Sequence, residues 1–411
     1  MRIAVVGAGV SGLTAAYLLS RRHEVEVFER NDYAGGHTNT ITVMAGGKPV
    51  PLDTGFVIYN EKTYPLFTQL LRQLDVETQP TDMSLSVSCT SCRVHFSSRG
   101  IPGFLAQPTN ILRPGLLRVG RDVLRFWRDA ELRVADGSSR ELTLGQYAER
   151  FSPEFKRHFL LPLGAAVWST DPHEVVSFPA EYFLQFLRRH AMTGSHDGLR
   201  WRVVRGGSHN YVRAMTRSLQ MRLDAPVTAV RRDADGVTVR VGEEEQHYDR
   251  VVLACHADEA LDLLTDPTCE EREALSSFSY NSNRVVLHTD SRLLPRRRPG
   301  RASWNYLTSD CRNGGGLEMT YHLNRLQSLD GPVDYCVSVN PPDALDPASV
   351  IKEMVYEHPR YTFESLKGQQ ALKCLNGSRF TYFAGAHMGY GFHEDGVASA
   401  VAVANQFGIE L

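Results

Sequence analysis

A glycine-rich turn near the beginning of the chain constrains the fold more than any other feature. The β-branched, apolar run Arg2 to Val6 is followed by three glycines spaced as G-x-G-x-x-G, which are Gly7, Gly9 and Gly12. Gly7 permits a tight turn after a strand, Gly9 lets backbone approach a pyrophosphate, and Gly12 lets the next helix pack closely on the strand. We therefore expect a buried parallel strand that leads into a helix.

The residues after this turn extend the pattern of a dinucleotide-binding domain. A helical pattern opens at Ser11, and a second strand, Glu24 to Phe28, ends beside the acid Glu29. The helix N-terminus faces the phosphate charge, and Glu29 can accept hydrogen bonds from ribose hydroxyls. Because strand, helix, second strand and acid occur in the required order, the turn predicts nucleotide binding. The alternative is a glycine-rich turn in another kind of α/β protein.

Size and composition set the class of protein. The 411 residues suffice for two domains, and 42% hydrophobic with 22% charged residues is usual for a soluble globular chain. A net charge of −2 gives no overall attraction to nucleic acid. Since no secretory hydrophobic region precedes the first strand and no apolar run reaches about 18 residues, we expect a cytoplasmic protein.

The seven cysteines are scattered, and Cys89 and Cys92 form a single C-x-x-C motif. A zinc site built on this motif usually has a second such pair, so we expect no metal site. We interpret the pair as two free thiols in a reducing compartment, with a redox-active pair as the alternative.

A second glycine pair, Gly35 and Gly36, follows Glu29 and permits another close backbone approach to a ligand. Together with Thr40, these residues resemble the pattern E-x-x-x-x-x-G-G-R-x-x-T of flavoproteins of the amine oxidase and phytoene desaturase superfamily. His37 stands where that superfamily usually has arginine. The resemblance implies that the bound dinucleotide is FAD.

Three separated blocks, residues 1–60, 201–256 and 380–411, carry this resemblance. Asp53-Thr54-Gly55 resembles the segment that passes the flavin ring, and the last block resembles the C-terminal flavin motif, in which a helix begins at the flavin. The FAD contacts that the glycine turn and the resemblance imply are at Gly7, Gly9, Ser11, Gly12, Glu29, Gly35, Gly36, His37, Thr38, Gly55, Val227, Gly385, Glu394, Asp395 and Gly396.

The resemblance also implies the fold class. We expect an α/β protein with a Rossmann-type FAD-binding domain and a second, α+β substrate domain. The FAD-binding domain is expected to be discontinuous and to comprise residues 1–80, 201–265 and 370–411. Residues 81–200 and 266–369 then form the substrate domain.

A closer resemblance is carried by DTGFVIYNEKTYP, LLPLGAAVWST, WNYL and GYGFHEDG. These stretches are similar to a bacterial group of amine-oxidase-like flavoproteins often encoded beside cyclopropane-fatty-acyl-type methyltransferases. The group implies an FAD-dependent oxidoreductase that desaturates or isomerises an unsaturated or methylated fatty acyl lipid, with such a methyltransferase as partner. The alternatives are an oxidase of small amines and a flavin-binding accessory protein of the methyltransferase. Fold analogy does not choose among them.

Four residues flank the flavin motifs and are the catalytic candidates: Tyr59, Asn60, Tyr390 and His393. A histidine can transfer protons near neutral pH, so His393 is a candidate acid or base. The alternative is a structural histidine that forms hydrogen bonds at a turn.

Two further segments bear on the substrate. Arginines interleave with apolar residues from Ile101 to Val134. This pattern predicts an amphipathic helix that either lies on an anionic membrane surface, giving peripheral contact at its inner face, or packs on the core with its arginines in solvent. The apolar stretch Leu160 to Trp168 contains several small residues and is interpreted as the wall of an acyl channel, with close helix packing as the alternative.

Overall fold

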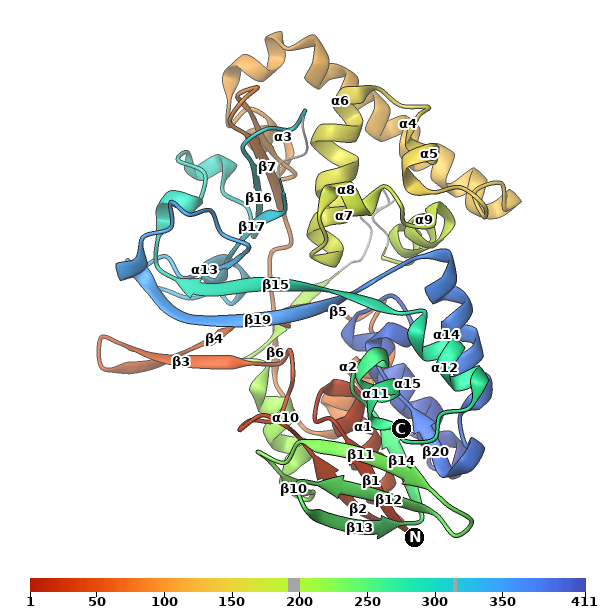
Figure 1. The fold of residues 1–411 in the computed structure, drawn as a ribbon. Helices are drawn as coiled ribbons and strands as arrows, with labels where there is room; N and C mark the ends of the chain where they lie inside the picture. Colours follow the sequence, from red (N-terminus) through yellow and green to blue (C-terminus); the bar gives the residue numbers. More distant parts are fainter. Residues whose placement is uncertain (191–199, 313–315) are drawn as a thin grey trace. The chain divides into compact units, whose positions relative to one another are not determined.

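The computed structural model describes residues 1–190, 200–312 and 316–411, which divide into two units. Unit 1 comprises Met1–Gln79, Val204–Tyr280 and Pro359–Leu411, and unit 2 comprises Pro80–Val203 and Asn281–His358. Both are discontinuous in sequence, as Figure 1 shows by the mixed colours within each. Residues 191–199, expected in the second domain, lie outside the described residues.

A five-stranded parallel sheet forms the centre of unit 1. Its strand order is β10-β2-β1-β14-β20, and Val5 of β1 pairs with Val27 on one side and Val252 on the other. This is the Rossmann-type sheet that the glycine turn predicts. The bounds are β1 Arg2–Val6, β2 Glu24–Phe28, β10 Gln220–Arg222, β14 Arg250–Leu253 and β20 Thr381–Phe383.

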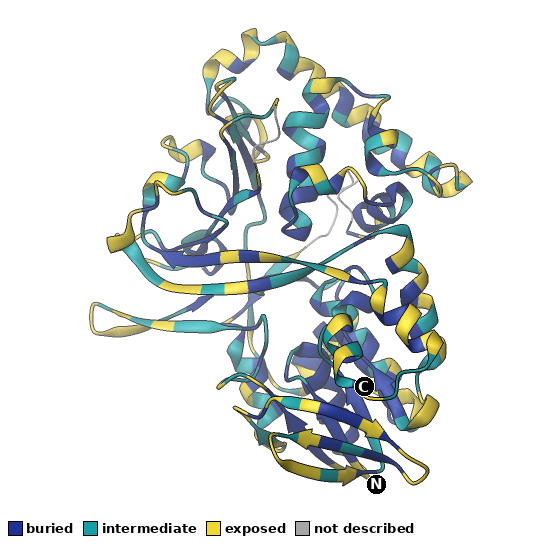
Figure 2. Ribbon diagram, viewed as in Figure 1, coloured by how far each residue is buried: buried dark blue, intermediate teal, exposed yellow. Residues whose placement is uncertain are grey.

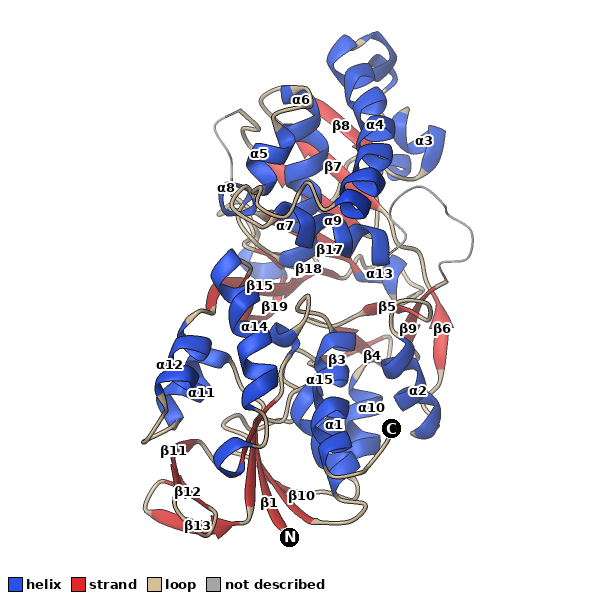
Figure 3. Cartoon of the chain, turned by 90° about the vertical axis from the view of Figure 1, so that its right-hand side faces the viewer, coloured by secondary structure: helices blue, strands red, loops and turns tan. Residues whose placement is uncertain are grey.

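Each face of this sheet is buried against a separate layer. Side chains alternate along β1, so Ile3 and Val5 join one hydrophobic cluster while Ala4 and Val6 join the other. Figure 3 shows α1, α10 and α15 on one side of the sheet, and α11, α12, α14 and the β11-β12-β13 sheet on the other. The helices are α1 Val10–Leu19, α2 Pro65–Gln73, α10 His209–Thr216, α11 Ala257–Leu263, α12 Cys269–Ser276, α14 Phe363–Leu375 and α15 His393–Gln406.

Residues 266–280 and 359–369 belong to unit 1, whereas the sequence analysis placed them in the substrate domain. The reason is long-range packing. Leu275 of α12 and Leu372 of α14 are buried in the same cluster as Leu253 of the central sheet. In addition, the buried guanidinium of Arg232 forms an ion pair with Glu271 of α12, with 2.6 Å between Nη1 and Oε1.

Among the remaining strands of unit 1, β3–β4 and β11–β12–β13 form small antiparallel sheets. Strands β3 and β4 form a hairpin in which Val43 pairs with Val50, and β11, β12 and β13 form a meander. The β13 strand was not expected from the sequence. The bounds are β3 Thr40–Ala45, β4 Lys48–Asp53, β5 Ile58–Asn60, β11 Val227–Arg232, β12 Val237–Val241 and β13 Glu244–Tyr248.

Unit 2 is built on a seven-stranded mixed sheet with the order β19-β15-β18-β17-β16-β7-β8. The hairpin β7–β8 extends this sheet because β7 pairs in parallel with β16. The long strand β19 was not expected, because its alternating charged residues leave no clear apolar period. The strands of this sheet are β7 Leu85–Cys89, β8 Val94–Ser97, β15 Ser279–His288, β16 Trp304–Thr308, β17 Glu318–His322, β18 Cys336–Val339 and β19 Val350–Arg360. Strands β6 Thr78–Pro80 and β9 Trp201–Val204 are not part of it.

Helices complete unit 2. The predicted amphipathic helix is α4, which is the longest of the described helices. None of the helices in the described part of the chain is both long and apolar enough to cross a membrane. The helical segments are α3 Gly100–Phe104, η1 Pro108–Leu112, α4 Pro114–Asp136, α5 Leu144–Ala148, α6 Pro153–Phe155, η2 Lys156–Leu160, α7 Leu161–Trp168, α8 Pro172–Val175, α9 Ala180–Arg189 and α13 Leu323–Leu326.

Candidate dinucleotide site

The three glycines of the first turn differ in what surrounds them. Gly7 has a φ of +100°, and a Cβ atom there would lie 2.8 Å from the carbonyl oxygen of Ala254. A Cβ atom at Gly12 would overlap the carbonyl oxygen of Gly7. Gly9, by contrast, has no described atom within 4 Å of its Cβ position. The outer glycines therefore permit close packing, and the middle one leaves an open space at the start of α1, as a pyrophosphate requires.

Glu29 and the second glycine pair lie against this turn. The backbone N–H of Ala8 donates to Oε2 of Glu29 at 2.8 Å, which fixes the carboxylate beside the turn. The N–H of Gly35 donates to the carbonyl oxygen of Ala8 at 2.8 Å. A Cβ atom at Gly36 would lie only 3.2 Å from Cα of Gly9. Three separate segments thus meet around the open space.

The N-termini of α1 and α15 also meet here. A Cβ atom at Gly396 would lie 2.7 Å from Cγ1 of Val10 and 2.8 Å from Oγ of Ser11. Glycine at this position lets the first turns of the two helices touch. The free amides and positive dipole ends of both helices are consequently close together, an arrangement that favours a negatively charged ligand.

The two acids at the start of α15 are engaged with backbone. Glu394 accepts hydrogen bonds from the N–H groups of Leu66 at 3.0 Å and Phe67 at 2.9 Å, and so caps α2. Asp395 accepts a hydrogen bond from the N–H of Phe392 at 3.0 Å, which caps α15 itself. Both residues stabilise helix ends at the site, and a direct contact of either with FAD stays a prediction.

The other predicted contacts lie on backbone near these segments. The N–H of Ala225 donates to the carbonyl oxygen of Glu29 at 2.9 Å, so β11 with Val227 begins beside the acid. Gly385 donates its N–H to Oγ of Ser399 in α15 at 3.0 Å. This bond connects the end of β20 to that helix.

Gly55 packs against the backbone that follows the second glycine pair. A Cβ atom at Gly55 would overlap the carbonyl oxygen of His37, and the N–H of Phe56 donates to that oxygen at 2.9 Å. The expected segments around Gly55, His37 and Thr38 are therefore neighbours in the fold.

His393 sits in a buried group of hydrogen bonds. Its Nε2 lies 2.9 Å from Oγ1 of Thr38 and 3.0 Å from the hydroxyl of Tyr211, and its ring stacks on Phe56 with 3.5 Å between centroids. Burial, with a smaller contribution from the positive charge of His37, lowers the pKa of His393 well below 6.5. The imidazole is neutral and held by two hydroxyl groups. A catalytic role for His393 stays a prediction.

The other three catalytic candidates, Tyr59, Asn60 and Tyr390, have different surroundings. Tyr59 is buried in the core of unit 1, with its ring edge-on to Phe67 at 5.3 Å between centroids. Asn60 is fully buried and accepts a hydrogen bond from the N–H of Thr63 at 3.0 Å. Tyr390 lies in the segment before α15 and is 9% exposed. The ring of Phe67 also lies edge-on to His393, with 5.7 Å between centroids.

Two further residues support this region: Tyr211, which the sequence analysis did not single out, and Asp53, which it named only as part of the segment Asp53-Thr54-Gly55. Tyr211 of α10 holds His393, and Asp53 is fully buried at the start of the same helix. Asp53 accepts hydrogen bonds from Oγ1 of Thr40 at 2.5 Å and the N–H of Ser208 at 2.9 Å. Burial raises the pKa of Asp53 from 3.8 to about 6, and these hydrogen bonds oppose the increase. An acid directly before Thr54-Gly55 was the available signal.

Curated relatives match parts of the chain. An L-amino-acid oxidase from Siganus canaliculatus is 24% identical over 323 residues, which is 70% of this chain and 56% of that protein. A 4,4'-diapophytoene desaturase from Staphylococcus aureus is 52% identical over 42 residues, which is 10% of this chain and 8% of that protein. The chain therefore matches little more than half the length of the first relative and a short segment of the second.

Solved structures match the whole fold. A CLA-producing fatty acid isomerase from P. acnes is 15% identical with a TM-score of 0.71, covering 99% of this chain and 98% of that one. Cyclohexylamine oxidase from Brevibacterium oxydans is 16% identical with a TM-score of 0.68, covering 99% of both chains. At these identities the likeness shows a shared two-domain fold.

The residues of unit 1 fit FAD. The open side of Gly9 at the joined N-termini of α1 and α15 suits a pyrophosphate, and the carboxylate of Glu29 is fixed beside it. The sequence profile of the flavin containing amine oxidoreductase family matches residues 10–406. The chain therefore belongs to this family of FAD-dependent oxidoreductases.

Proposed function

We propose that the protein is an FAD-dependent oxidoreductase that desaturates or isomerises an unsaturated or methylated fatty acyl lipid. The observation that carries the proposal is the surface of the segment 101–134 in unit 2. This surface joins exposed apolar side chains to arginines, which is the chemistry expected of a protein that takes its substrate from an anionic membrane.

The long helix α4 has two faces of different character. One face buries Leu116, Val119 and Phe126 in unit 2. Another face carries an exposed stripe of leucines and arginines at helical spacing, which is visible as yellow segments along α4 in Figure 2. The members of this Leu/Arg stripe are Leu117, Arg121, Leu124, Arg128 and Leu132, with Arg118 and Arg125 at its edge.

The exposure of the Leu/Arg stripe is large. Leu124 is 73% exposed, and Leu112, just before the helix, is 81% exposed. Burying one such side chain in lipid contributes about 1.5–3 kcal/mol, and each arginine adds about 1 kcal/mol at an anionic surface. Packing against the core accounts for the buried face of α4. It does not account for the exposed leucines, which remain in solvent. Together, the burial of these leucines in lipid and the attraction of the arginines to anionic headgroups favour attachment of α4 to a membrane.

The packing inside unit 2 changes which part of the segment Leu160 to Trp168 could line the expected acyl channel. A Cβ atom at Gly164 would lie 2.5 Å from Cγ1 of Val175, and three phenylalanine rings surround Trp168 with centroids 4.7–5.5 Å away. Small residues on this side of α7 therefore permit close helix packing. Leu161, Leu163 and Val167 are partly exposed, and Leu163 and Val167, four positions apart on one side of the helix, form the apolar wall we propose for an acyl chain.

The fold of the CLA-producing fatty acid isomerase supports an acyl substrate, although the identity of 15% supports the fold first. When bound, FAD supplies a hydride acceptor for the substrate. The residues of this chain position the cofactor through Gly9 and Glu29 and keep His393 neutral and fixed. We also propose the methyltransferase partner expected from the resemblance, and its copurification with the chain tests that point.

The test is anaerobic incubation of the FAD-loaded protein with vesicles that contain unsaturated and methylated acyl chains. Desaturation leaves the flavin reduced, and isomerisation leaves it oxidised while double bonds move, which mass spectrometry detects. Either result supports the proposal. Rapid flavin reduction by small amines, with no lipid converted, would replace it by an amine oxidase. An oxidised flavin with neither substrate changed would favour the accessory protein.

A further inference from the structure

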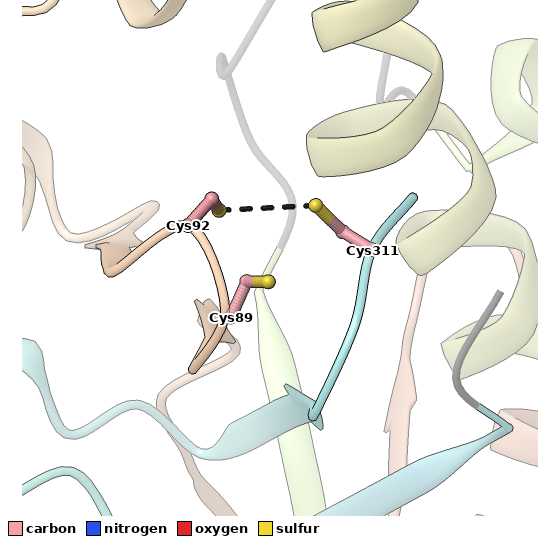
Figure 4. Close-up of side chains that lie close together, drawn as sticks. All are labelled: Cys89, Cys92 and Cys311. Carbon is pink, nitrogen blue, oxygen red and sulfur yellow. Dashed lines mark hydrogen bonds between the residues drawn. The ribbon is translucent and has the colours of Figure 1, made fainter. Parts of the chain in front are cut away.

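Unit 2 brings three cysteines together. Cys89 ends β7, Cys92 lies in the turn of the β7–β8 hairpin, and Cys311 follows β16. The three sulfur atoms lie within 4.8 Å of one another, and Sγ of Cys92 is 3.8 Å from Sγ of Cys311. Figure 4 shows the three side chains converging from two chain segments. The C-x-x-C pair thus has a third thiol beside it.

A backbone framework holds the two segments together. Strand β7 pairs in parallel with β16, so that Cys89 is opposite Thr308. Beyond the strands, the N–H of Thr90 donates to the carbonyl oxygen of Thr308 at 3.0 Å, and that of Ser91 to Ser309 at 3.1 Å. The position of Cys311 relative to the hairpin is therefore set by ordinary sheet hydrogen bonds.

A histidine completes the group. Nε2 of His158 lies 3.8 Å from Sγ of Cys92 and 3.9 Å from Sγ of Cys311. His158 is buried within the π-helical segment η2, a type of irregular turn that often occurs at functional sites. Its Nε2 faces both sulfurs, and a neutral imidazole can supply the lone pair of this atom to a metal ion.

Three of these distances, the 3.8 Å between the sulfurs of Cys92 and Cys311 and the 3.8 and 3.9 Å from those sulfurs to Nε2 of His158, are close to the distances between ligands of one tetrahedral metal ion. The sulfur of Cys89 lies within 4.8 Å of the other two sulfurs. With Zn–S bonds of about 2.3 Å and a Zn–N bond of about 2.0 Å, two sulfurs are about 3.8 Å apart and a sulfur and a nitrogen about 3.6 Å. We propose that Cys89, Cys92, Cys311 and His158 form a zinc site. Four protein ligands close the coordination shell, so the site is structural: it joins the β7–β8 hairpin, the segment after β16 and η2.

The surroundings suit the charge of such a site. Three thiolates and a neutral imidazole around Zn²⁺ carry a net charge of −1. The guanidinium of Arg113 donates to the carbonyl oxygen of Cys92 at 2.9 Å, and it offsets this charge. Binding replaces three thiol protons by one Zn²⁺, with no oxidation.

The test measures metal in the FAD-loaded, full-length protein purified under reducing conditions. Elemental analysis is expected to find one zinc ion per chain. Replacing zinc by Co²⁺ is expected to add thiolate-to-cobalt and tetrahedral d–d absorption, the latter at wavelengths where oxidised flavin does not absorb. Cys311→Ser and His158→Asn are expected to lower zinc content at least tenfold while FAD content, a readout of unit 1, stays unchanged.

Matched controls use the exposed cysteines outside the group. Cys374→Ser and Cys269→Ser are expected to keep a full zinc ion. If a variant in the group fails to fold, the metal content and cobalt spectrum of the unaltered protein decide the matter. The proposal is overturned if the reduced protein, supplied with zinc and then dialysed, retains none. A disulfide between Cys92 and Cys311 in metal-free protein would also overturn it.

Discussion

The glycine turn permits a sharp comparison between two neighbouring substitutions, Gly9→Ala and Gly12→Ala. Both add one methyl group within the same turn of unit 1. The Cβ position of Gly9 is open and its φ is −73°, a conformation that any residue adopts. The Cβ position of Gly12 coincides with the carbonyl oxygen of Gly7. We therefore expect a side chain at position 9 to affect the binding of the cofactor, and Gly12→Ala to affect the stability of the fold.

The expected changes in the free energy of unfolding follow from the surroundings of the two glycines. Without FAD, Gly9→Ala removes a favourable helix N-cap residue and is expected to cost about 0.5–1 kcal/mol. Gly12→Ala forces α1 away from β1, and overpacking of this kind costs about 1–3 kcal/mol or more. FAD at 1,000 times its Kd adds about 4 kcal/mol of stability to a protein that binds it. Gly9→Val, with a larger side chain in the space of the pyrophosphate, is expected to lose this gain completely.

The assay is thermal unfolding of each apoprotein with and without added FAD, together with the flavin content of the purified protein. The packing effect is the difference in stability between the unaltered protein and Gly12→Ala, both measured without FAD. The cofactor effect is the difference in stability between the unaltered protein and Gly9→Val, both measured with FAD. Stoichiometric FAD in Gly9→Val would show that the pyrophosphate lies elsewhere. Apoprotein stability of Gly12→Ala equal to that of the unaltered protein would refute the packing argument.

Three further predictions concern the cofactor, the membrane and pH. Acid precipitation is expected to release all FAD into the supernatant, because Cys374, which precedes the C-terminal flavin motif, is an exposed residue of α14 and lies in no recognisable attachment motif. Flavin retained in the pellet would contradict this. Changing Arg118, Arg121 and Arg125 to Gln is expected to weaken binding to vesicles with anionic phospholipid by at most about 3 kcal/mol, or roughly 100-fold, in a sedimentation assay at low salt. Equal binding of both proteins would remove the membrane proposal. The raised pKa of Asp53 means that the folded state binds its proton more tightly than the unfolded state, so stability falls by about 3 kcal/mol as pH rises from about 4 to about 6. Asp53→Asn is expected to lose this part of the pH dependence in urea unfolding, and identical slopes for the two proteins would refute it.

Local sequence predicted much of unit 1. The G-x-G-x-x-G turn, β1, α1 and β2 are a contiguous stretch in which each conformation depends on residues a few positions away. The predicted strand–turn–helix order is present, and Gly7 and Gly12 have the close packing that their positions imply. By contrast, residues 266–280 and 359–369, expected in the substrate domain, lie in unit 1 because Leu275 and Leu372 find their partners far along the chain.

The site residues also divide into those that local sequence could assign and those whose contacts lie far along the chain. Glycines could be assigned from spacing because a turn without a Cβ atom is a local requirement. The roles of side chains depended on distant partners: Glu394 caps α2, and His393 is held by Thr38 and Tyr211, more than 180 positions away in the latter case. No local pattern records such a contact.

The sequence by itself therefore determined the dinucleotide-binding domain, because backbone conformation and spacing are encoded within short segments. The resemblance of its motifs to those of amine oxidase and phytoene desaturase flavoproteins identified FAD as the cofactor. The tertiary structure decided which surfaces are free and which side chains meet. Only the folded chain separates the buried face of α4 from the exposed stripe with Leu124. Likewise, the sequence offered Cys89 and Cys92 as an isolated pair, and pairing of β7 with β16 added Cys311 while the packing of η2 added His158. Such groups form through the burial of many residues at once, and that is a property of the whole unit.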